Sequence, residues 1–215
     1  MLAMLLCLLL AALGPCGAAA EESAWQTLCG QHGLEGTDVI AWLEIPGYPL
    51  CLPVMQHPAD DAFYASHAPD GSGNAYGSVY VQAKYNAPDF SDPVTLLYGS
   101  SASEDAPFGR LQEQYSGSFD GCRMIFLHTR DATQAYLVFA ALPYSSVHIL
   151  HYYNFRNARR YTGFFDSVFS TRALGMHLDR DGRPVAGTDQ VIILSTGLRG
   201  DPLQRYLVMA KKISQ

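Results

Sequence analysis

The residues of this chain best suited to chemistry lie near its end, where Ser195 and Thr196 close an apolar run and Arg205 follows a short polar segment. An arginine keeps its charge at physiological pH and can hold a carbonyl oxygen or a carboxylate. A serine or threonine hydroxyl attacks a carbonyl only when a general base stands beside it. No histidine lies near this segment in the sequence, so the pattern favours binding over amide cleavage.

The cysteines and histidines offer no clear catalytic pair. Of five cysteines, Cys7 and Cys16 lie in the apolar beginning of the chain. The other three, Cys29, Cys51 and Cys122, are odd in number and lack metal-ligand spacing, which predicts isolated thiols, no metal site and no cofactor. The histidines are scattered singly, as is typical of surface or structural imidazoles. They include His57, His67, His128, His148 and His151.

Composition favours one domain with small appendages. The 215 residues are 48% hydrophobic and 16% charged, which is sufficient for a sizeable core. The formal net charge of -6 argues against the basic surface that nucleic-acid binding requires.

The first 20 residues differ from the rest. Residues 2–13 form an unbroken apolar run, about half of the ~20 residues that a membrane-spanning helix needs. The small residues 18–20 fit a cleavage site before Glu21, although no basic residue precedes Lys84. We expect residues 1–20 to be a signal peptide or a truncated signal anchor and the chain to be exported, with membrane anchoring through this segment left open.

Hydrophobic patterning predicts many short strands and little helix after residue 38. Residues 21–38 are expected to form a helical appendage, and residues 39–215 the main domain. Predicted strands cover residues 39–45, 49–56, 78–82, 94–98, 123–129, 135–142, 191–197 and 205–210. Predicted helices cover residues 60–66, 107–114 and 154–169. About eight strands without a βαβ rhythm indicate a closed or nearly closed β-barrel.

The order of several segments resembles the class B sortases, cysteine transpeptidases of Gram-positive cell surfaces. Residues 42–47, 53–64 and 77–80 are similar to that family's first strands and short helix, and residues 94–111 to the segment around its catalytic histidine. Residues 191–205 resemble its Leu-Ser-Thr-Cys strand, loop and arginine. The resemblance covers residues 39–213 and implies a mainly β, closed eight-stranded barrel with an N-terminal helix and a helix inserted before the last two strands.

The resemblance also implies positions for the three catalytic residues of the family. The arginine is retained as Arg205, but the cysteine position is Gly197, and Tyr98-Gly99-Ser100 places Ser100 at the histidine position. Glycine has no attacking atom, and a serine does not titrate near neutral pH. Loss of the nucleophile in a comparable triad costs about 10⁶ in rate.

The substrate groove implied by the resemblance is altered. Asp61 stands where the family commonly has Asn, and Ala65 where a Leu helps to form the floor. Ser195 and Thr196 are kept.

Arg205 and Gly197 each allow two interpretations. Arg205 is expected either to bind peptide or to pair with Asp201 or Asp105. Gly197 is expected to be open to substitution by Cys unless its backbone conformation requires glycine.

The first functional hypothesis is an exported, catalytically inactive sortase-like protein. It would bind a sorting-signal peptide or a pilin-type surface protein, or assist an active sortase, at the extracellular face of the membrane or the cell wall. The alternative is a divergent, active sortase whose nucleophile has moved, with Cys51 and Cys122 as the candidates. An engineered inactive form is a third interpretation, but such variants seldom replace both residues.

Overall fold

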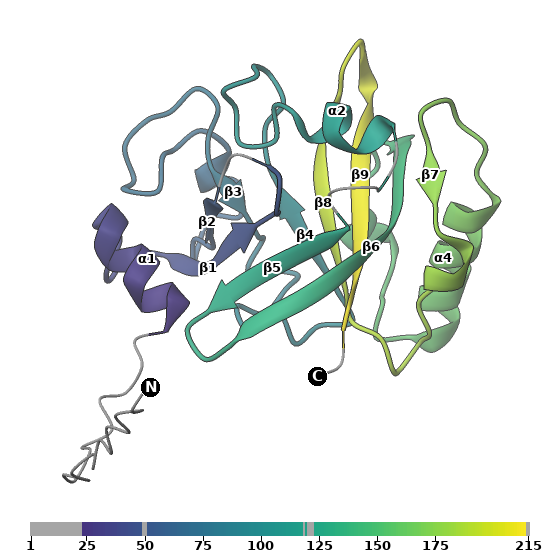
Figure 1. The fold of residues 1–215 in the computed structure, drawn as a ribbon, viewed down its shortest axis with the longest axis horizontal. Helices are drawn as coiled ribbons and strands as arrows, with labels where there is room; N and C mark the ends of the chain where they lie inside the picture. The colour runs from purple at the N-terminus through teal and green to yellow at the C-terminus, as the bar shows by residue number, and fades with distance from the viewer. Residues whose placement is uncertain (1–22, 49–50, 118, 120–122, 214–215) are drawn as a thin grey trace, which may run out of the picture.

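The computed structural model describes residues 23–48, 51–117, 119 and 123–213 (Figure 1). The signal peptide or anchor expected at residues 1–20 lies outside the described residues, as does Cys122. No helix within the described part of the chain is long and apolar enough to span a membrane.

Eight strands close into a barrel. They are β1 (Val39–Glu44), β2 (Cys51–Met55), β3 (Val79–Tyr80), β4 (Val94–Tyr98), β5 (Met124–Thr129), β6 (Thr133–Ser145), β8 (Val191–Leu198) and β9 (Asp201–Lys212). Their order is β5-β1-β2-β3-β4-β8-β9-β6, and pairing of β6 with β5 closes the ring. The short β7 (His177–Leu178) pairs with β6 outside this ring. The predicted eight-stranded barrel is therefore confirmed.

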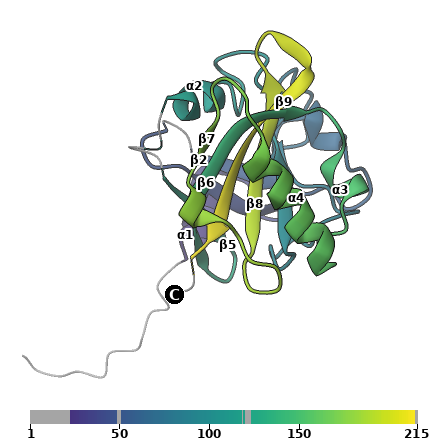
Figure 2. The same cartoon turned by 90° about the vertical axis from the view of Figure 1, so that its right-hand side faces the viewer.

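Two longer helices lie on opposite sides of the barrel (Figure 1). The first, α1 (Ala24–His32), begins with a capping box between Ser23 and Gln26 and ends at Gly33 in the left-handed conformation. The second, α4 (Ala158–Ser170), lies in front of the barrel in Figure 2. The shorter helices are η1 (Phe63–Ala65), α2 (Leu111–Ser116), α3 (Ile149–Tyr152) and η2 (Arg180–Gly182).

Helix α4 is amphipathic because its apolar residues recur at intervals of three and four. Tyr161, Phe164, Phe165 and Val168 are all buried against the outer face of the barrel. The helix begins later than the predicted start at residue 154, because the side chain of Asn157 accepts the Arg160 N–H and caps it. As predicted, this helix precedes the last two strands of the barrel.

Alternation along β8 divides its side chains between two apolar layers. Ile192 and Leu194 belong to the interior of the barrel, whereas Val191 and Ile193 pack with α4 on its outer face. A third cluster under α1 includes the buried Trp42. The same alternation determines which residues at the end of β8 can reach the outer surface.

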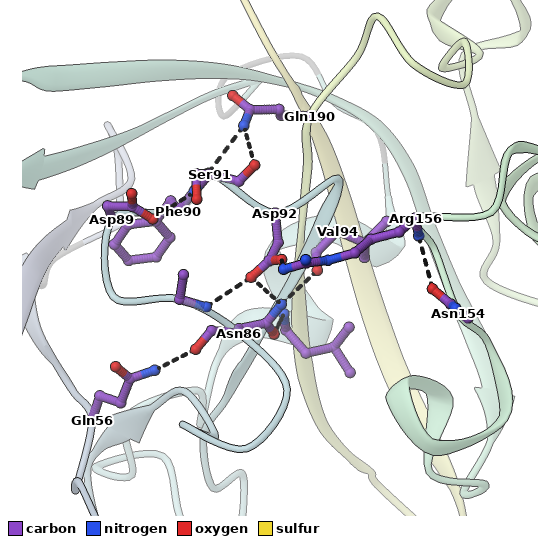
Figure 3. Close-up of polar contacts among 12 residues, drawn as sticks. Gln56, Asn86, Asp89, Phe90, Ser91, Asp92, Val94, Asn154, Arg156 and Gln190 are labelled. Atoms are coloured by element: carbon purple, nitrogen blue, oxygen red, sulfur yellow. Dashed lines mark hydrogen bonds and ion pairs between the residues drawn. The ribbon is translucent and has the colours of Figure 1, made fainter.

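A buried polar network fixes the loop that enters β4 (Figure 3). The Asn86 side chain donates to the Val94 carbonyl at 2.8 Å and accepts from the Leu96 N–H at 3.2 Å. Asp92, which is 6% exposed, accepts from the Arg156 guanidinium at 2.8 Å. These contacts join the start of β4 to the segment between α3 and α4, and so hold in register the strand that leads into Ser100.

The last hairpin is tighter than predicted. Arg205 does not open its strand: β8 continues to Leu198 and β9 begins at Asp201, which leaves only a short turn at residues 199–200. Gly200 adopts a φ of 84°, a conformation that glycine accepts without strain. Residues 201–204 have a loop-like composition that includes Asp201, Pro202 and Gln204, and this end of β9 is at least partly exposed. The composition here therefore indicated solvent exposure and not a loop.

Candidate functional site

A pocket of about 400 Å³ lies on the surface beside the ends of β4 and β8. Four residues selected from the sequence line it: Ala65, Ser100, Gly197 and Arg205. The remaining lining residues are Tyr76, Ser78, Tyr80, Tyr98, Gly99, Ser101 and Ala102. Segments far apart in the sequence thus meet at one site. The described lining contains no cysteine, histidine or acidic residue.

Arg205 is held in place by neighbours on β4 and β8. Its Nε donates to Ser195 Oγ at 2.7 Å, and its Nη2 donates to the Ser195 carbonyl at 3.3 Å. Its Cζ lies 5.6 Å from the centre of the Tyr98 ring, within cation–π range. Pairing with Asp201 or Asp105 is not observed, and the Asp201 carboxylate accepts from the Gln204 side chain at 2.7 Å. No ion pair involves Arg205 within the described residues.

Gly197 lies directly opposite Arg205 in the antiparallel pair, so a side chain at residue 197 would lie on the same face as the guanidinium. Its φ is outside the left-handed region, and an added Cβ would have one neighbour within 4 Å, Ser101 Oγ at 3.3 Å. That hydroxyl donates to the Gly197 carbonyl at 2.8 Å. Of the two alternatives given for this position, the structure favours the first, because the backbone at residue 197 does not require glycine.

Ser100 follows β4 in a segment that requires a glycine before it. A Cβ on Gly99 would approach a carbon of the buried Phe108 ring to 2.5 Å. The Ser100 carbonyl accepts from the Phe108 N–H at 2.8 Å, and its Oγ accepts from the Ala102 N–H at 3.2 Å. The hydroxyl proton of Ser100 has no acceptor among the described residues, so it is available to a ligand.

Three of the predicted groove residues do not line this pocket. Asp61 accepts the Lys84 N–H at 3.1 Å and fixes a loop. Ser195 is 1% exposed and supports Arg205 from beneath. Thr196 is completely buried, and its hydroxyl has no partner within the described residues. Strand alternation explains the position of Thr196, which points to the opposite face of β8 from Gly197. Ser195 shares the face of Gly197 but is in contact with Arg205 and is buried.

The tyrosines of the pocket were not predicted as site residues. Tyr80 and Tyr98 stack with their ring centres 5.4 Å apart, and Tyr76 is 38% exposed. Burial raises the pKa of the Tyr98 hydroxyl, although the charge of Arg205 opposes this shift. The phenol is therefore a neutral hydrogen-bond donor at pH 7. Tyr98 and Ser101 lie within two residues of the predicted Ser100, so their place in the sequence could have indicated them. Only the folded loop brings Tyr76 to the pocket.

The alternative nucleophile Cys51 lies elsewhere. Together with Glu44 and His128, it lines an open cavity of about 610 Å³ beside α1. Burial, and secondarily the Glu44 carboxylate, raises the pKa of this thiol to about 11, so it is protonated at neutral pH. The two ring nitrogens of His128 form hydrogen bonds, Nε2 with the Glu44 carboxylate at 2.8 Å and Nδ1 with the Thr133 hydroxyl at 2.9 Å. Within the described chain, no three His, Cys, Asp or Glu side chains gather as metal ligands.

No protein-family model and no curated protein sequence matches the chain. Solved structures do. Clostridium perfringens sortase B is 20% identical with a TM-score of 0.71, over 86% of this chain and 98% of that one. Staphylococcus aureus sortase B is 19% identical with a TM-score of 0.70, over 90% and 89%. A Streptococcus pyogenes class B sortase involved in pilus biogenesis is 17% identical with a TM-score of 0.67, over 82% and 92%.

Proposed function

Because the chain has the class B sortase fold, we propose that it is an exported sortase-like protein that binds peptide without transferring it. Its ligand would be a sorting-signal peptide or a pilin-type surface protein, and an active sortase is a further partner, at the outer surface of a Gram-positive cell. The observation that carries this proposal is the pocket itself. The pocket retains Arg205, but Gly197 lies opposite the guanidinium, where the resemblance places the cysteine. Ser100 lines the same pocket, where the resemblance places the histidine.

The pocket has groups that hold a carbonyl but none that opens an amide. Transpeptidation requires an activated nucleophile and a proton-transfer partner. The hydroxyl nearest the Gly197 Cβ position is Ser101 Oγ, and its proton is donated to the Gly197 carbonyl. No described histidine lines the pocket to activate it. Arg205 and the Ser100 hydroxyl would therefore orient a bound peptide.

Peptide binding is supported by the similar structures. One of them is a Staphylococcus aureus sortase B–substrate complex, 20% identical to this chain with a TM-score of 0.68. The pilus-associated structure from Streptococcus pyogenes motivates the pilin-type ligand.

The test is to incubate the full chain with fluorescent sorting-signal peptides and to score binding and cleavage separately. We expect binding without cleavage. The Gly197→Cys variant should react weakly, because its thiol lacks an imidazole. Adding Ser100→His should produce a thioacyl adduct, detected by intact mass, with a gain larger than the two single changes multiplied together. Ser100→His combined with Gly197→Ala is the matched control without a thiol.

Two outcomes would contradict the proposal. If the unaltered chain cleaves the peptides, it is an enzyme, and Cys51→Ser and Cys122→Ser would then locate the moved nucleophile. If the folded double variant neither reacts with nor binds any sorting-signal peptide, the groove does not serve this ligand.

A further inference from the structure

Arg205 forms no ion pair among the described residues, and the described lining of its pocket contains no acid. Asp61 is the acid whose charge acts on Tyr80 and Tyr98 together with Arg205, and it does not line the pocket. Within the described chain, Arg110, Arg123, Arg156 and Arg183 each pair with a carboxylate. The other described arginines outside ion pairs are exposed, whereas Arg205 is half-buried. Burying a charge is costly unless a partner compensates it. In a chain with a net charge of -6, Arg205 makes this pocket locally basic.

The guanidinium is already oriented for such an anion. Ser195 occupies its Nε and Nη2 on one edge, and the Tyr98 ring lies against it. The Nη1 atom has no partner within the described residues. Arginine binds carboxylates through two parallel N–H groups in a planar fork. A guanidinium that is fixed on one edge presents its remaining donors with little further loss of side-chain freedom.

The surroundings supply a further donor and space. The Ser100 hydroxyl proton has no described acceptor. Gly197 has no side chain opposite Arg205, so the surface beside the guanidinium is open. A single cation with neutral hydroxyls suits a monoanion better than a phosphate, whose charge at pH 7 is about -1.5 to -2.

We infer that this pocket binds a peptide carboxylate, with Arg205 as its cation and Ser100 as a neutral donor. The inference deepens the proposed peptide-binding function and rests on it for the identity of the ligand as a peptide. The carboxylate is either the free C-terminus of a peptide or an acidic side chain. Both present the same planar anion to the guanidinium.

The test uses N-acetyl-Ala-Ala as the free acid, the same dipeptide as its C-terminal amide, and N-acetyl-aspartate amide. Binding to the ¹⁵N-labelled full chain is followed through the Gly99 and Gly197 amide signals. We expect the acid to bind at least about tenfold more tightly than the amide, since hydrogen bonds to charged groups are the strong ones. The preference should fall as salt is added. Tighter binding of the aspartate amide would identify a side-chain carboxylate as the source.

Variants locate the effect. Arg205→Gln should abolish the preference for the acid, and Arg205→Lys, which keeps the charge without the fork, should leave an intermediate preference. Arg159→Gln, an exposed arginine of α4 outside the pocket, makes the same charge change as a control. Thermal melts establish that each variant folds.

The outcomes separate this inference from the proposed function. Equal affinity for acid and amide, or an unchanged preference in folded Arg205→Gln, overturns the carboxylate site. If sorting-signal peptides bind but show no such preference, only this inference fails. If the acid dipeptide binds and no sorting-signal peptide does, the carboxylate site stands and the proposed function fails.

Discussion

Two glycines line the same pocket, and their replacement by alanine should have opposite consequences. A Cβ on Gly99 would lie 2.5, 2.8 and 2.8 Å from three carbons of the Phe108 ring. A Cβ on Gly197 would meet only Ser101 Oγ, at 3.3 Å. Phe108 is completely buried and cannot move away freely, whereas the Ser101 side chain is partly exposed. Gly99 is therefore required by packing, and Gly197 is not.

The sizes of the two effects follow from these contacts. Carbon atoms pack best at about 3.5–4.0 Å, so Gly99→Ala forces a displacement of about 1 Å. Overpacking of this kind costs about 1–3 kcal/mol. Gly197→Ala needs a shift of a few tenths of an ångström, offset by about 0.4–1 kcal/mol from the smaller entropy of the unfolded chain. Each kcal/mol changes the Tm of a chain of this length by about 2–4 °C.

Differential scanning calorimetry of the two variants is the assay. We expect Gly99→Ala to lower the Tm by roughly 2–12 °C and Gly197→Ala to change it by less than about 3 °C. Gly163→Ala, in α4 with nothing within 4 Å of its Cβ, should raise the Tm by about 2–4 °C and serves as the control. A loss for Gly197→Ala as large as that for Gly99→Ala and above about 3 °C would refute the packing argument and would mean that the fold disfavours a side chain at residue 197.

Two further predictions concern residues beside and outside the pocket. Thr196→Val should stabilise the protein by about 1 kcal/mol, because it removes a buried hydroxyl without a described partner; a lower urea midpoint would contradict this. Cys51 should resist iodoacetamide at pH 8, with alkylation accelerating as the pH rises toward its pKa of about 11, because a raised pKa keeps the thiol protonated below that value. Peptide mapping would measure this, with the urea-unfolded chain as the reactive control; equal rates in the two states would refute it.

The predicted strands were largely correct because hydrophobic patterning and strand length are local properties. The apolar run at residues 191–194 forms the centre of β8, and the predicted strand at residues 94–98 is β4. The boundaries in the last hairpin were wrong because residues 201–204, the partly exposed start of β9, have the composition of a loop. The late start of α4 follows from the Asn157 cap, which the apolar spacing alone does not reveal.

The amino-acid types at residues 100, 197 and 205 were determined by the sequence alone, and with them the absence of a thiol at residue 197 and of an imidazole at residue 100. Only the tertiary structure decided how these residues meet. Pairing of β8 with β9 sets Gly197 opposite Arg205, and the strand alternation that buries Thr196 sends Ser195 to support the guanidinium. Such contacts join residues far apart along the chain, and closure of the barrel fixes them. For the same reason, no local pattern revealed the unpaired guanidinium and its tyrosine neighbours.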